Sequence, residues 1–233
     1  QEPTKLTVSD WLDVWLAEYT GDVKPLTRST YKNKMESTIK PALGAVKLQA
    51  LKAPQIQKML NDLQRGTSGR KPLSAKTVKD IYGILHRALG QAVEVGYLRI
   101  NPSDACKLPR VEHPEIKPLD EAQTAAFLNA IRGQPFERLF IVDLLTGLRQ
   151  GELLGLRWKD MDFDAGTVTV AQQLLKSKEK GSAYFFGSLK NDKTRLLTPA
   201  PSVMKALREQ RRVQTEWRLK AGTLWEDPAW YLR

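Results

Sequence analysis

A proline-rich stretch without a regular apolar repeat interrupts the middle of the chain, and it constrains the fold more than any other feature. It spans residues 101–118 and contains four prolines, Pro102, Pro109, Pro114 and Pro118. Proline fixes its own φ and lacks a backbone N–H, so a run of this kind is typical of a linker between folded units. With 233 residues, the chain has room for two small domains. We therefore predict a first domain, with its linker, at residues 1–112 and a second domain at residues 113–233.

The first hundred residues predict four helices. Thr7 opens a capping box ahead of the first helix, and Thr27 is the expected N-cap of a second helix that stops before Pro41. Pro54 suits the first turn of a third helix, and Ser74 is the expected N-cap of a long fourth helix. Apolar side chains recur at helical spacing through each of these segments, which is typical of a small helical bundle.

The second domain is expected to combine helices with short strands. Three helices come first, at residues 119–131, 135–145 and 151–156. The alternating, β-branched segment 167–173 predicts a strand, with residues 184–189 and 195–198 as its partners in one small antiparallel sheet. Pro201 opens a last long helix that ends near Lys220. The expected fold class is therefore mainly α, with a small antiparallel sheet in a partial α+β second domain.

The charge of the chain indicates a polyanionic partner. There are 37 basic and 26 acidic residues, which leaves a formal net charge of +11. The excess is concentrated in residues 1–110, where 18 basic residues stand against 10 acidic ones. Double-stranded DNA is the partner that this imbalance favours, and a general role of the charge in solubility is the alternative.

Cysteine content and apolar runs indicate a cytoplasmic protein. The single cysteine, Cys106, cannot form an internal disulfide and has no neighbouring cysteine or histidine with which to bind zinc. No apolar run reaches the roughly 18 residues of a membrane span, and the first residues lack the pattern of a signal peptide. We expect a cytoplasmic, nucleoid-associated protein that needs no metal, no cofactor and no membrane.

An arginine that follows a glycine turn is the most informative residue of the second domain. An apolar helix is expected to end at Gly147, and Arg149 then stands where a new helix begins, with Glu152 three residues further on. A guanidinium beside the N–H groups of a helix start is suited to phosphate oxygens. The alternative is that Arg149 pairs with Glu152, one helical turn away. The residues alone leave both possibilities open.

Residues 146–158 closely resemble the first catalytic-arginine box of the tyrosine recombinases, the phage integrase family. They have the order Thr-Gly-Leu-Arg-x-Gly-Glu-Leu-Leu-x-Leu-x-Trp, and residues 160–162 follow with Asp-Met-Asp. The resemblance implies that Arg149 contacts the phosphate at which DNA is cut. It also implies that Glu152 is a supporting residue that helps to hold the site in shape.

A second match to the family lies between Leu189 and Pro199. In this family a lysine on a β-hairpin precedes a basic stretch and a strand that ends in a proline, and Lys190 has that place here. A departing 5′ oxygen needs a proton, which an ammonium group held over the phosphodiester can donate. We favour Lys190 over Lys193 for this role, and we expect Lys193 and Arg195 to contact DNA.

The four predicted helices of the first domain resemble the SAM-like core-binding domain that these enzymes place before the catalytic domain. Two of the helices are expected to face DNA, with Ser, Thr, Lys and Arg near their N-termini as anchors for phosphate. The residues of this domain that are expected to contact DNA are Thr27, Arg28, Ser29, Lys32, Lys34, Lys76, Thr77, Lys79 and Arg87.

The other catalytic groups of the family are not recognisable in the sequence. The family's second box needs a His-x-x-Arg arrangement and, after it, a nucleophilic tyrosine. His86 falls in the first domain, and His113 falls in the linker beside Pro114. We reject Tyr231 as the nucleophile because its neighbours indicate a strand. We therefore expect a fragment that binds DNA without turnover.

The resemblance implies site-specific DNA recombination as the function of the whole enzyme. A tyrosine attacks a phosphodiester, which forms a 3′-phosphotyrosyl link and frees a 5′ hydroxyl, and the covalent link conserves the bond energy. Such enzymes are expected to act as homo-tetramers on paired recombination sites. A non-catalytic DNA-binding regulator and a type IB topoisomerase are the alternatives. Phage integration, transposon movement and chromosome resolution all stay open as roles.

Overall fold

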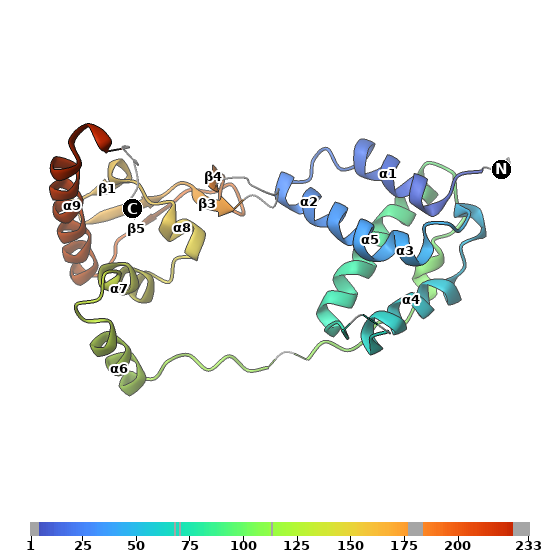
Figure 1. Ribbon diagram of the computed structural model, residues 1–233, viewed down its shortest axis with the longest axis horizontal. Helices are drawn as coiled ribbons and strands as arrows, with labels where there is room; N and C mark the ends of the chain where they lie inside the picture. Colours follow the sequence, from blue (N-terminus) through green and yellow to red (C-terminus); the bar gives the residue numbers. More distant parts are fainter. Residues whose placement is uncertain (1–4, 68, 70, 113, 177–183, 226–233) are drawn as a thin grey trace. The chain divides into compact units, whose positions relative to one another are not determined.

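The computed structural model describes residues 5–67, 69, 71–112, 114–176 and 184–225. The chain divides into two compact units, residues 1–115 and residues 116–233 (Figure 1). Each unit has its own cluster of buried apolar side chains. Most elements are helices, and the strand pairs are antiparallel, so the predicted fold class is confirmed.

The first unit is a helical bundle, as the apolar spacing predicts (Figure 1). Its helices are α1 (Val8–Glu18), the consecutive segments α2 (Pro25–Lys34), η1 (Met35–Ile39) and α3 (Lys40–Leu43), then α4 (Ala53–Arg65) and α5 (Ala75–Glu94). Two short 3₁₀ turns are η2 (Leu48–Ala50) and η3 (Pro102–Ala105).

The inward faces of these helices form one apolar core. Trp11, Leu12, Met35 and Ile39 are fully inaccessible to solvent. Burial of one such side chain stabilises a fold by roughly 1.5–3 kcal/mol relative to an exposed position. The indole N–H of Trp11 donates to the carbonyl oxygen of Ala88 at 2.7 Å, so its buried polar atom is paired. This hydrogen bond ties α1 to α5.

Three predicted helix starts are confirmed. Thr7 Oγ1 accepts the N–H of Asp10 at 3.2 Å, and Asp10 Oδ2 accepts the N–H of Thr7 at 3.0 Å. Ser74 Oγ accepts the N–H of Thr77 at 3.2 Å, and Pro54 lies in the first turn of α4. The hydroxyls of Thr7 and Ser74 accept hydrogen bonds from N–H groups that the first turn of a helix leaves without a partner.

The second helix differs from its predicted bounds at both ends. It begins at Pro25, two residues before Thr27, which is therefore not its cap. A proline at this position has the right φ and needs no N–H. The helix also continues through Pro41. A π-helical turn, in which the N–H of Lys40 bonds to the carbonyl oxygen of Met35, precedes this proline, so Pro41 falls in the first turn of α3, where no N–H is required.

The second unit has helices first and strands next, in the predicted order. Its helices are α6 (Glu121–Ile131), α7 (Glu137–Thr146), α8 (Gln150–Leu154) and α9 (Pro201–Ala221), with 3₁₀ turns η4 (Trp158–Asp160) and η5 (Gly222–Leu224). Its strands are β1 (Met161–Asp162), β2 (Thr167–Val170), β3 (Gln173–Lys176), β4 (Tyr184–Gly187) and β5 (Arg195–Leu197). Buried side chains of α7 and α9, Val142 and Leu207 among them, belong to its core.

The strands form two sheets instead of the single sheet predicted. The first has the order β1-β2-β5, with Val168 opposite Leu197 and Val170 opposite Arg195, and the second is the hairpin β3-β4. The segment 167–173 is therefore not one strand. It is interrupted at Gln172, whose side-chain amide donates to the carbonyl oxygen of Gly155 at 3.0 Å. This contact directs the chain away from the first sheet and toward α8.

Two glycines allow β3 to lie directly against α8. A Cβ atom at Gly151 would stand 2.9 Å from the carbonyl oxygen of Leu174, and one at Gly155 would stand 2.9 Å from Cα of Gln173. Both neighbours are backbone atoms, which cannot move aside as a flexible side chain does. Gly151 and Gly155 of the motif therefore serve the packing of α8 on β3.

Candidate active site and nucleic-acid interface

A glycine turn places Arg149 at the start of α8. Gly147 has a left-handed conformation, with φ of +60°, and its N–H bonds to the carbonyl oxygen of Asp143 at 2.9 Å, which ends α7. Arg149 then has extended backbone and is the N-cap residue of α8. Its side chain is 64% exposed. The turn therefore presents this arginine to solvent from a fixed backbone position.

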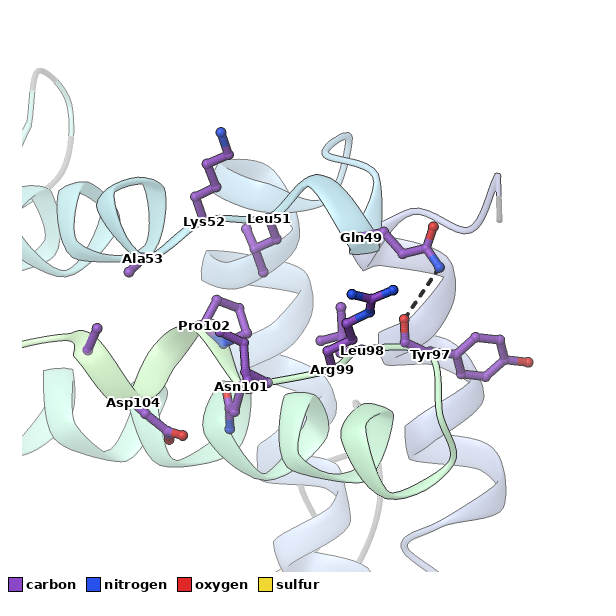
Figure 2. A pocket seen from close by; sticks show the side chains of 12 residues that line it. Gln49, Leu51, Lys52, Ala53, Tyr97, Leu98, Arg99, Asn101, Pro102 and Asp104 are labelled. Carbon is purple, nitrogen blue, oxygen red and sulfur yellow. Dashed lines mark hydrogen bonds between the residues drawn. The ribbon is translucent and has the colours of Figure 1, made fainter. Parts of the chain in front are cut away.

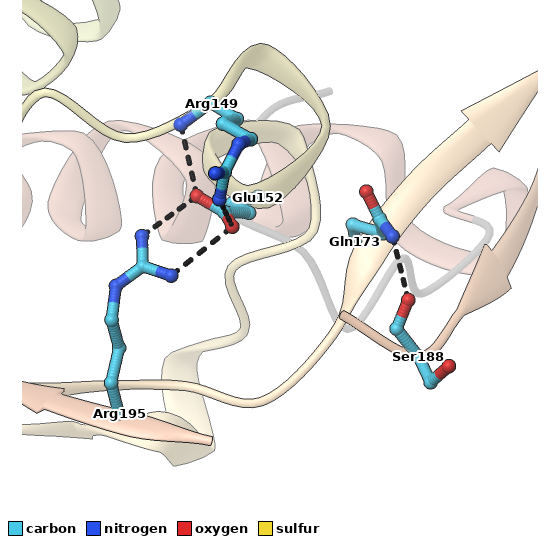
Figure 3. Close-up of polar contacts among 5 residues, drawn as sticks. All are labelled: Arg149, Glu152, Gln173, Ser188 and Arg195. Atoms are coloured by element: carbon cyan, nitrogen blue, oxygen red, sulfur yellow. Dashed lines mark hydrogen bonds and ion pairs between the residues drawn. The ribbon is translucent and has the colours of Figure 1, made fainter. Parts of the chain in front are cut away.

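Glu152 is buried at this turn and accepts four hydrogen bonds (Figure 3). Arg149 donates its backbone N–H to Oε2 at 2.9 Å and its Nη1 to Oε1 at 3.0 Å. Arg195 donates Nη1 to Oε1 at 3.1 Å and Nη2 to Oε2 at 2.7 Å. The side chain of Glu152 is only 2% exposed. One carboxylate thus joins the start of α8 to the first residue of β5.

These contacts keep Glu152 ionised at neutral pH. Its pKa is lowered from 4.5 to about 2. The hydrogen bonds from Arg195 are the largest cause, burial of the carboxyl opposes them, and the hydrogen bonds from Arg149 add to the shift. The same ion pair raises the pKa of Arg195.

The structure shows the ion pair that was one of the two possibilities for Arg149. Its Nη1 bonds to Glu152, while most of the side chain stays exposed. Because arginine has several N–H donors in one plane, this pair leaves donors for a further acceptor. The ion pair and a phosphate contact are therefore compatible, and the phosphate contact stays a prediction.

The two candidate lysines lie in the turn between β4 and β5. Leu189 is buried at the start of this turn, and its carbonyl oxygen accepts the N–H of Asp192 at 3.0 Å. Lys190 and Lys193 are both exposed. The turn leads into β5. The first residue of β5, Arg195, forms the ion pair with Glu152 of α8. The choice between the two lysines as proton donor stays a prediction.

Arg28, an expected DNA contact of the first unit, bonds to the end of α1. Its Nε and Nη2 donate to the carbonyl oxygen of Leu16 at 3.2 and 2.9 Å, and Nη2 also reaches that of Ala17 at 3.4 Å. The last carbonyls of a helix have no partner within the helix, so the guanidinium completes this end. Arg28 therefore has a structural role whether or not it also contacts DNA.

Arg87, another expected contact, lies on an aromatic pair. Its guanidinium carbon is 5.8 Å from the centroid of the Tyr31 ring, Nη1 bonds to the hydroxyl of Tyr31, and that ring stacks on Trp15 at 5.8 Å.

Nζ of Lys76 lies 3.8 Å from Oδ1 of Asp80. The other expected contacts lie at the surface of α2 and α5 as exposed or half-buried side chains, namely Thr27, Ser29, Lys32, Lys34, Thr77 and Lys79.

The sequence matches two family profiles in consecutive regions. Residues 7–64 match the phage integrase N-terminal SAM-like domain, and residues 117–220 match the phage integrase family. The chain belongs to the phage integrase family. The second match includes the positions of Arg149, Glu152 and Lys190.

Similar proteins with curated names are longer than this integrase-family chain. It is 33% identical over 237 residues to a tyrosine recombinase XerC-like protein of Caldanaerobacter subterraneus subsp. tengcongensis, a match that covers 94% of this chain and 59% of the relative. It is 28% identical to an integrase of Streptomyces ambofaciens, with 97% of this chain and 57% of the relative covered. The chain therefore spans somewhat more than half the length of these relatives.

Solved structures of integrases have the same fold. The Tn1549 transposon integrase in complex with transposon right end DNA superposes with a TM-score of 0.77 and 25% identity, over 89% of this chain and 65% of that one. A lambda integrase tetramer bound to a Holliday junction gives 0.62 and 20% identity, over 89% of this chain and 57% of that one. At this lower identity the likeness shows the fold alone.

The histidines and the tyrosine considered for the integrase chemistry belong to the first unit or fall outside the described residues. His86 belongs to α5, and its Nε2 lies 2.9 Å from Oδ1 of Asp104, so it is part of the first unit. His113 and Tyr231 lie outside the described residues. In the described ranges, no helix of this integrase-family chain is long and apolar enough to cross a membrane.

A hollow of about 790 Å³ in the first unit contains none of the predicted site residues (Figure 2). It lies between the segment from η2 to the start of α4 and the segment from the end of α5 to η3. Gln49 bridges its two sides through a 3.5 Å hydrogen bond to the carbonyl oxygen of Tyr97. Lys52 and Arg99 line it together with Asp104. The residues of the integrase motifs, Arg149 among them, do not line this hollow.

The ion pair between Arg195 and Glu152 was missed by sequence reasoning. The two residues are 43 positions apart, and nothing in their spacing indicates contact. The sequence assigned Arg195 to DNA and Glu152 to a supporting role. β5 pairs with β2, and its first residue, Arg195, bonds to Glu152 of α8.

Proposed function

We propose that the chain binds double-stranded DNA and forms part of the active site of a site-specific recombinase. The observation that carries the proposal is the exposed guanidinium of Arg149, fixed on the ionised Glu152, in a member of the phage integrase family. A rigidly held guanidinium is a strong partner for phosphate oxygens. The Tn1549 integrase, which has the same fold, is in complex with DNA.

The proposed reaction is a transfer of a phosphodiester bond without loss of its energy. A tyrosine oxygen attacks phosphorus, a 3′-phosphotyrosyl bond forms, and the bond to the 5′ oxygen breaks. Arg149 offsets negative charge on the non-bridging oxygens, and Lys190 donates a proton to the 5′ oxygen. The tyrosine and the His-x-x-Arg group belong to the whole enzyme and are assigned to no residue of this chain, which on its own binds DNA without turnover.

The first unit supplies the main hold on the DNA backbone in this proposal. Its basic residues at the surface of α2 and α5, Lys32 and Lys79 among them, contact phosphates and position the duplex without reading its sequence. Lys193 adds a contact from the second unit. The whole enzyme acts as a homo-tetramer on paired sites, in the cytoplasm and at the nucleoid.

The salt dependence of DNA binding tests the proposal. We expect the affinity for a fluorescent duplex of mixed sequence, followed by fluorescence anisotropy, to fall at least about a hundredfold between about 50 and 200 mM salt. The double variant Lys32→Ala, Lys79→Ala should bind more weakly and reduce the slope of log K against log salt by about two. The control, Lys205→Ala with Lys220→Ala on α9, removes the same charge and should leave the slope unchanged.

An affinity that barely responds to salt would contradict this function. Two further assays on the whole enzyme separate the alternatives. A DNA-binding regulator forms no covalent protein–DNA complex, whereas a recombinase does. A type IB topoisomerase relaxes supercoiled DNA but does not exchange strands between two sites.

A further inference from the structure

The carboxylate of Glu152 binds two arginines at the same time. Each of its oxygens accepts two hydrogen bonds, one from Arg149 and one from Arg195. Arg195 binds with both terminal nitrogens in the bidentate geometry that guanidinium and carboxylate favour. Arg149 needs only one guanidinium nitrogen and its backbone N–H. Both hydrogen bonds from Arg195 thus come from its guanidinium, whereas only one of the two from Arg149 does.

The sheet holds the backbone of Arg195. Arg195 is the first residue of β5 and pairs with Val170 of β2, which is fully buried. Its side chain is 39% exposed and that of Arg149 is 64% exposed, while that of Glu152 is 2% exposed. The sheet therefore brings the guanidinium of Arg195 to the buried carboxylate from a segment that lies far from α8 in the sequence.

Loss of Arg195 would leave the buried carboxylate with half of its hydrogen bonds. A buried charge without its partners is costly, so the structure responds by recruiting the nearest cation. Arg149 already touches Oε1, and its remaining guanidinium donors can turn inward to Oε2. Such a turn removes those donors from the surface, where a phosphate would meet them.

We infer that Arg195 is a positioning residue, whose bidentate ion pair with Glu152 keeps the guanidinium of Arg149 available to a DNA phosphate. This inference rests on the proposed function, in which Arg149 contacts that phosphate. It gives Arg195 a different role from the direct DNA contact that the sequence predicts. It also links the lysine turn to the site, because Lys193 precedes Arg195 by two residues on the way into β5.

A double-mutant cycle on this chain tests the inference. The probe is a fluorescent duplex of mixed sequence, and the readouts are its affinity and salt slope. In the wild-type background, Arg149→Ala should weaken binding about tenfold and reduce the slope by about one. In the Arg195→Ala background, the same substitution should change affinity less than about twofold, because Arg149 has already turned to Glu152.

A rescue variant separates positioning from direct contact. Adding Glu152→Gln to Arg195→Ala removes the charge that captures Arg149, so we expect most of the lost affinity and slope to return. If Arg195 itself contacted DNA, the affinity would not return and the two arginine substitutions would be additive. Either result overturns the inference.

The matched control is Arg157, which forms a comparable pair with Asp160, from Nε at 2.5 Å and Nη2 at 2.9 Å. Arg157→Ala should combine additively with Arg149→Ala, because this pair does not involve Glu152.

Thermal unfolding checks each variant. If Arg195→Ala does not fold, Arg195→Lys replaces it in the cycle. Its ammonium is a point charge without the fork, so the effect of Arg149→Ala should fall between those in the other two backgrounds. An effect equal to that in wild type would overturn the inference.

The effect of Arg149→Ala in the wild-type background distinguishes failure of the proposed function from failure of the positioning role of Arg195. If this substitution leaves affinity and slope unchanged, the phosphate contact of the proposed function is wrong, and the role of Arg195 falls with it. If Arg149→Ala weakens binding equally in the wild-type and the Arg195→Ala backgrounds, the proposed function stands and only the positioning role of Arg195 is wrong.

Discussion

Glu152 is tolerated in the interior of the second unit because its charge is fully compensated. An isolated carboxylate in an apolar environment would be protonated or would destabilise the fold. Here four hydrogen bonds from two arginines surround it, and its pKa is about 2. The charge of Glu152 is therefore part of the folded structure, and its removal should be measurable as a change in stability.

The stability of the second unit should depend on Glu152 in acid. Its pKa in the folded protein lies below the ordinary value of 4.5, so its contribution is fully present above pH 4.5 and is lost as the pH falls toward about 2. The shift corresponds to at most about 3 kcal/mol. We expect Glu152→Gln to lower the free energy of urea unfolding at neutral pH, and to differ less from wild type near pH 3. An equal difference at both pH values would contradict this account.

Loss of Lys190 should affect one step of the reaction, the donation of a proton to the departing 5′ oxygen. In the whole enzyme on a nicked suicide substrate, Lys190→Ala should slow cleavage by about 10²–10⁴-fold and leave DNA affinity nearly unchanged. Lys193→Ala is the control in the same turn and should slow cleavage far less. A substrate with sulfur in place of the 5′ oxygen should restore cleavage, because a thiolate leaves without a proton. Undiminished cleavage by Lys190→Ala would remove this lysine from the mechanism.

At the scale of elements, the sequence predicts helices better than strand pairing. The caps at Thr7 and Ser74 are local hydrogen bonds, so a few neighbouring residues are enough to recognise them. The start of the second helix was missed because Pro25 competes with Thr27 for the same role. Its continuation through Pro41 was missed because a π turn has no sequence pattern of its own.

Strand pairing was only partly predicted because it depends on contacts between distant segments. The pairing of β2 with β5 is as expected, whereas β3 leaves the first sheet and packs against α8. The same limit applies to the site. Arg149 and Glu152 are three residues apart and their pair was foreseen as one possibility, but the partner from β5 was not.

The contact between α8 and β3 should not tolerate side chains at its glycines. Gly151→Ala places a Cβ atom 2.9 Å from the carbonyl oxygen of Leu174, and we expect it to lower the free energy of unfolding by about 1–3 kcal/mol. Gly83→Ala in α5 is the control, because no atom other than those of its own stretch of helix lies within 4 Å of its Cβ position. Since alanine favours a helix, this control should raise stability by up to about 1 kcal/mol. Chemical denaturation measures both, and equal effects would contradict the packing argument.

At the scale of the whole molecule, the residues that the structure describes form two apolar cores. The first contains Trp11 and Ile39, the second contains Val142 and Leu207, and each lies within its own compact unit. The proline-rich stretch predicted a division near residue 112. The two family profiles also match on either side of it, at residues 7–64 and 117–220.

Separate cores have a consequence for damaged copies of the protein. In the proposed function, a mutation that collapses only the second unit leaves the first one able to bind DNA. Such a copy would compete with intact subunits for DNA and would block the assemblies that contain it. Loss-of-function alleles that unfold the second unit should therefore be dominant, whereas alleles that unfold the first should be recessive.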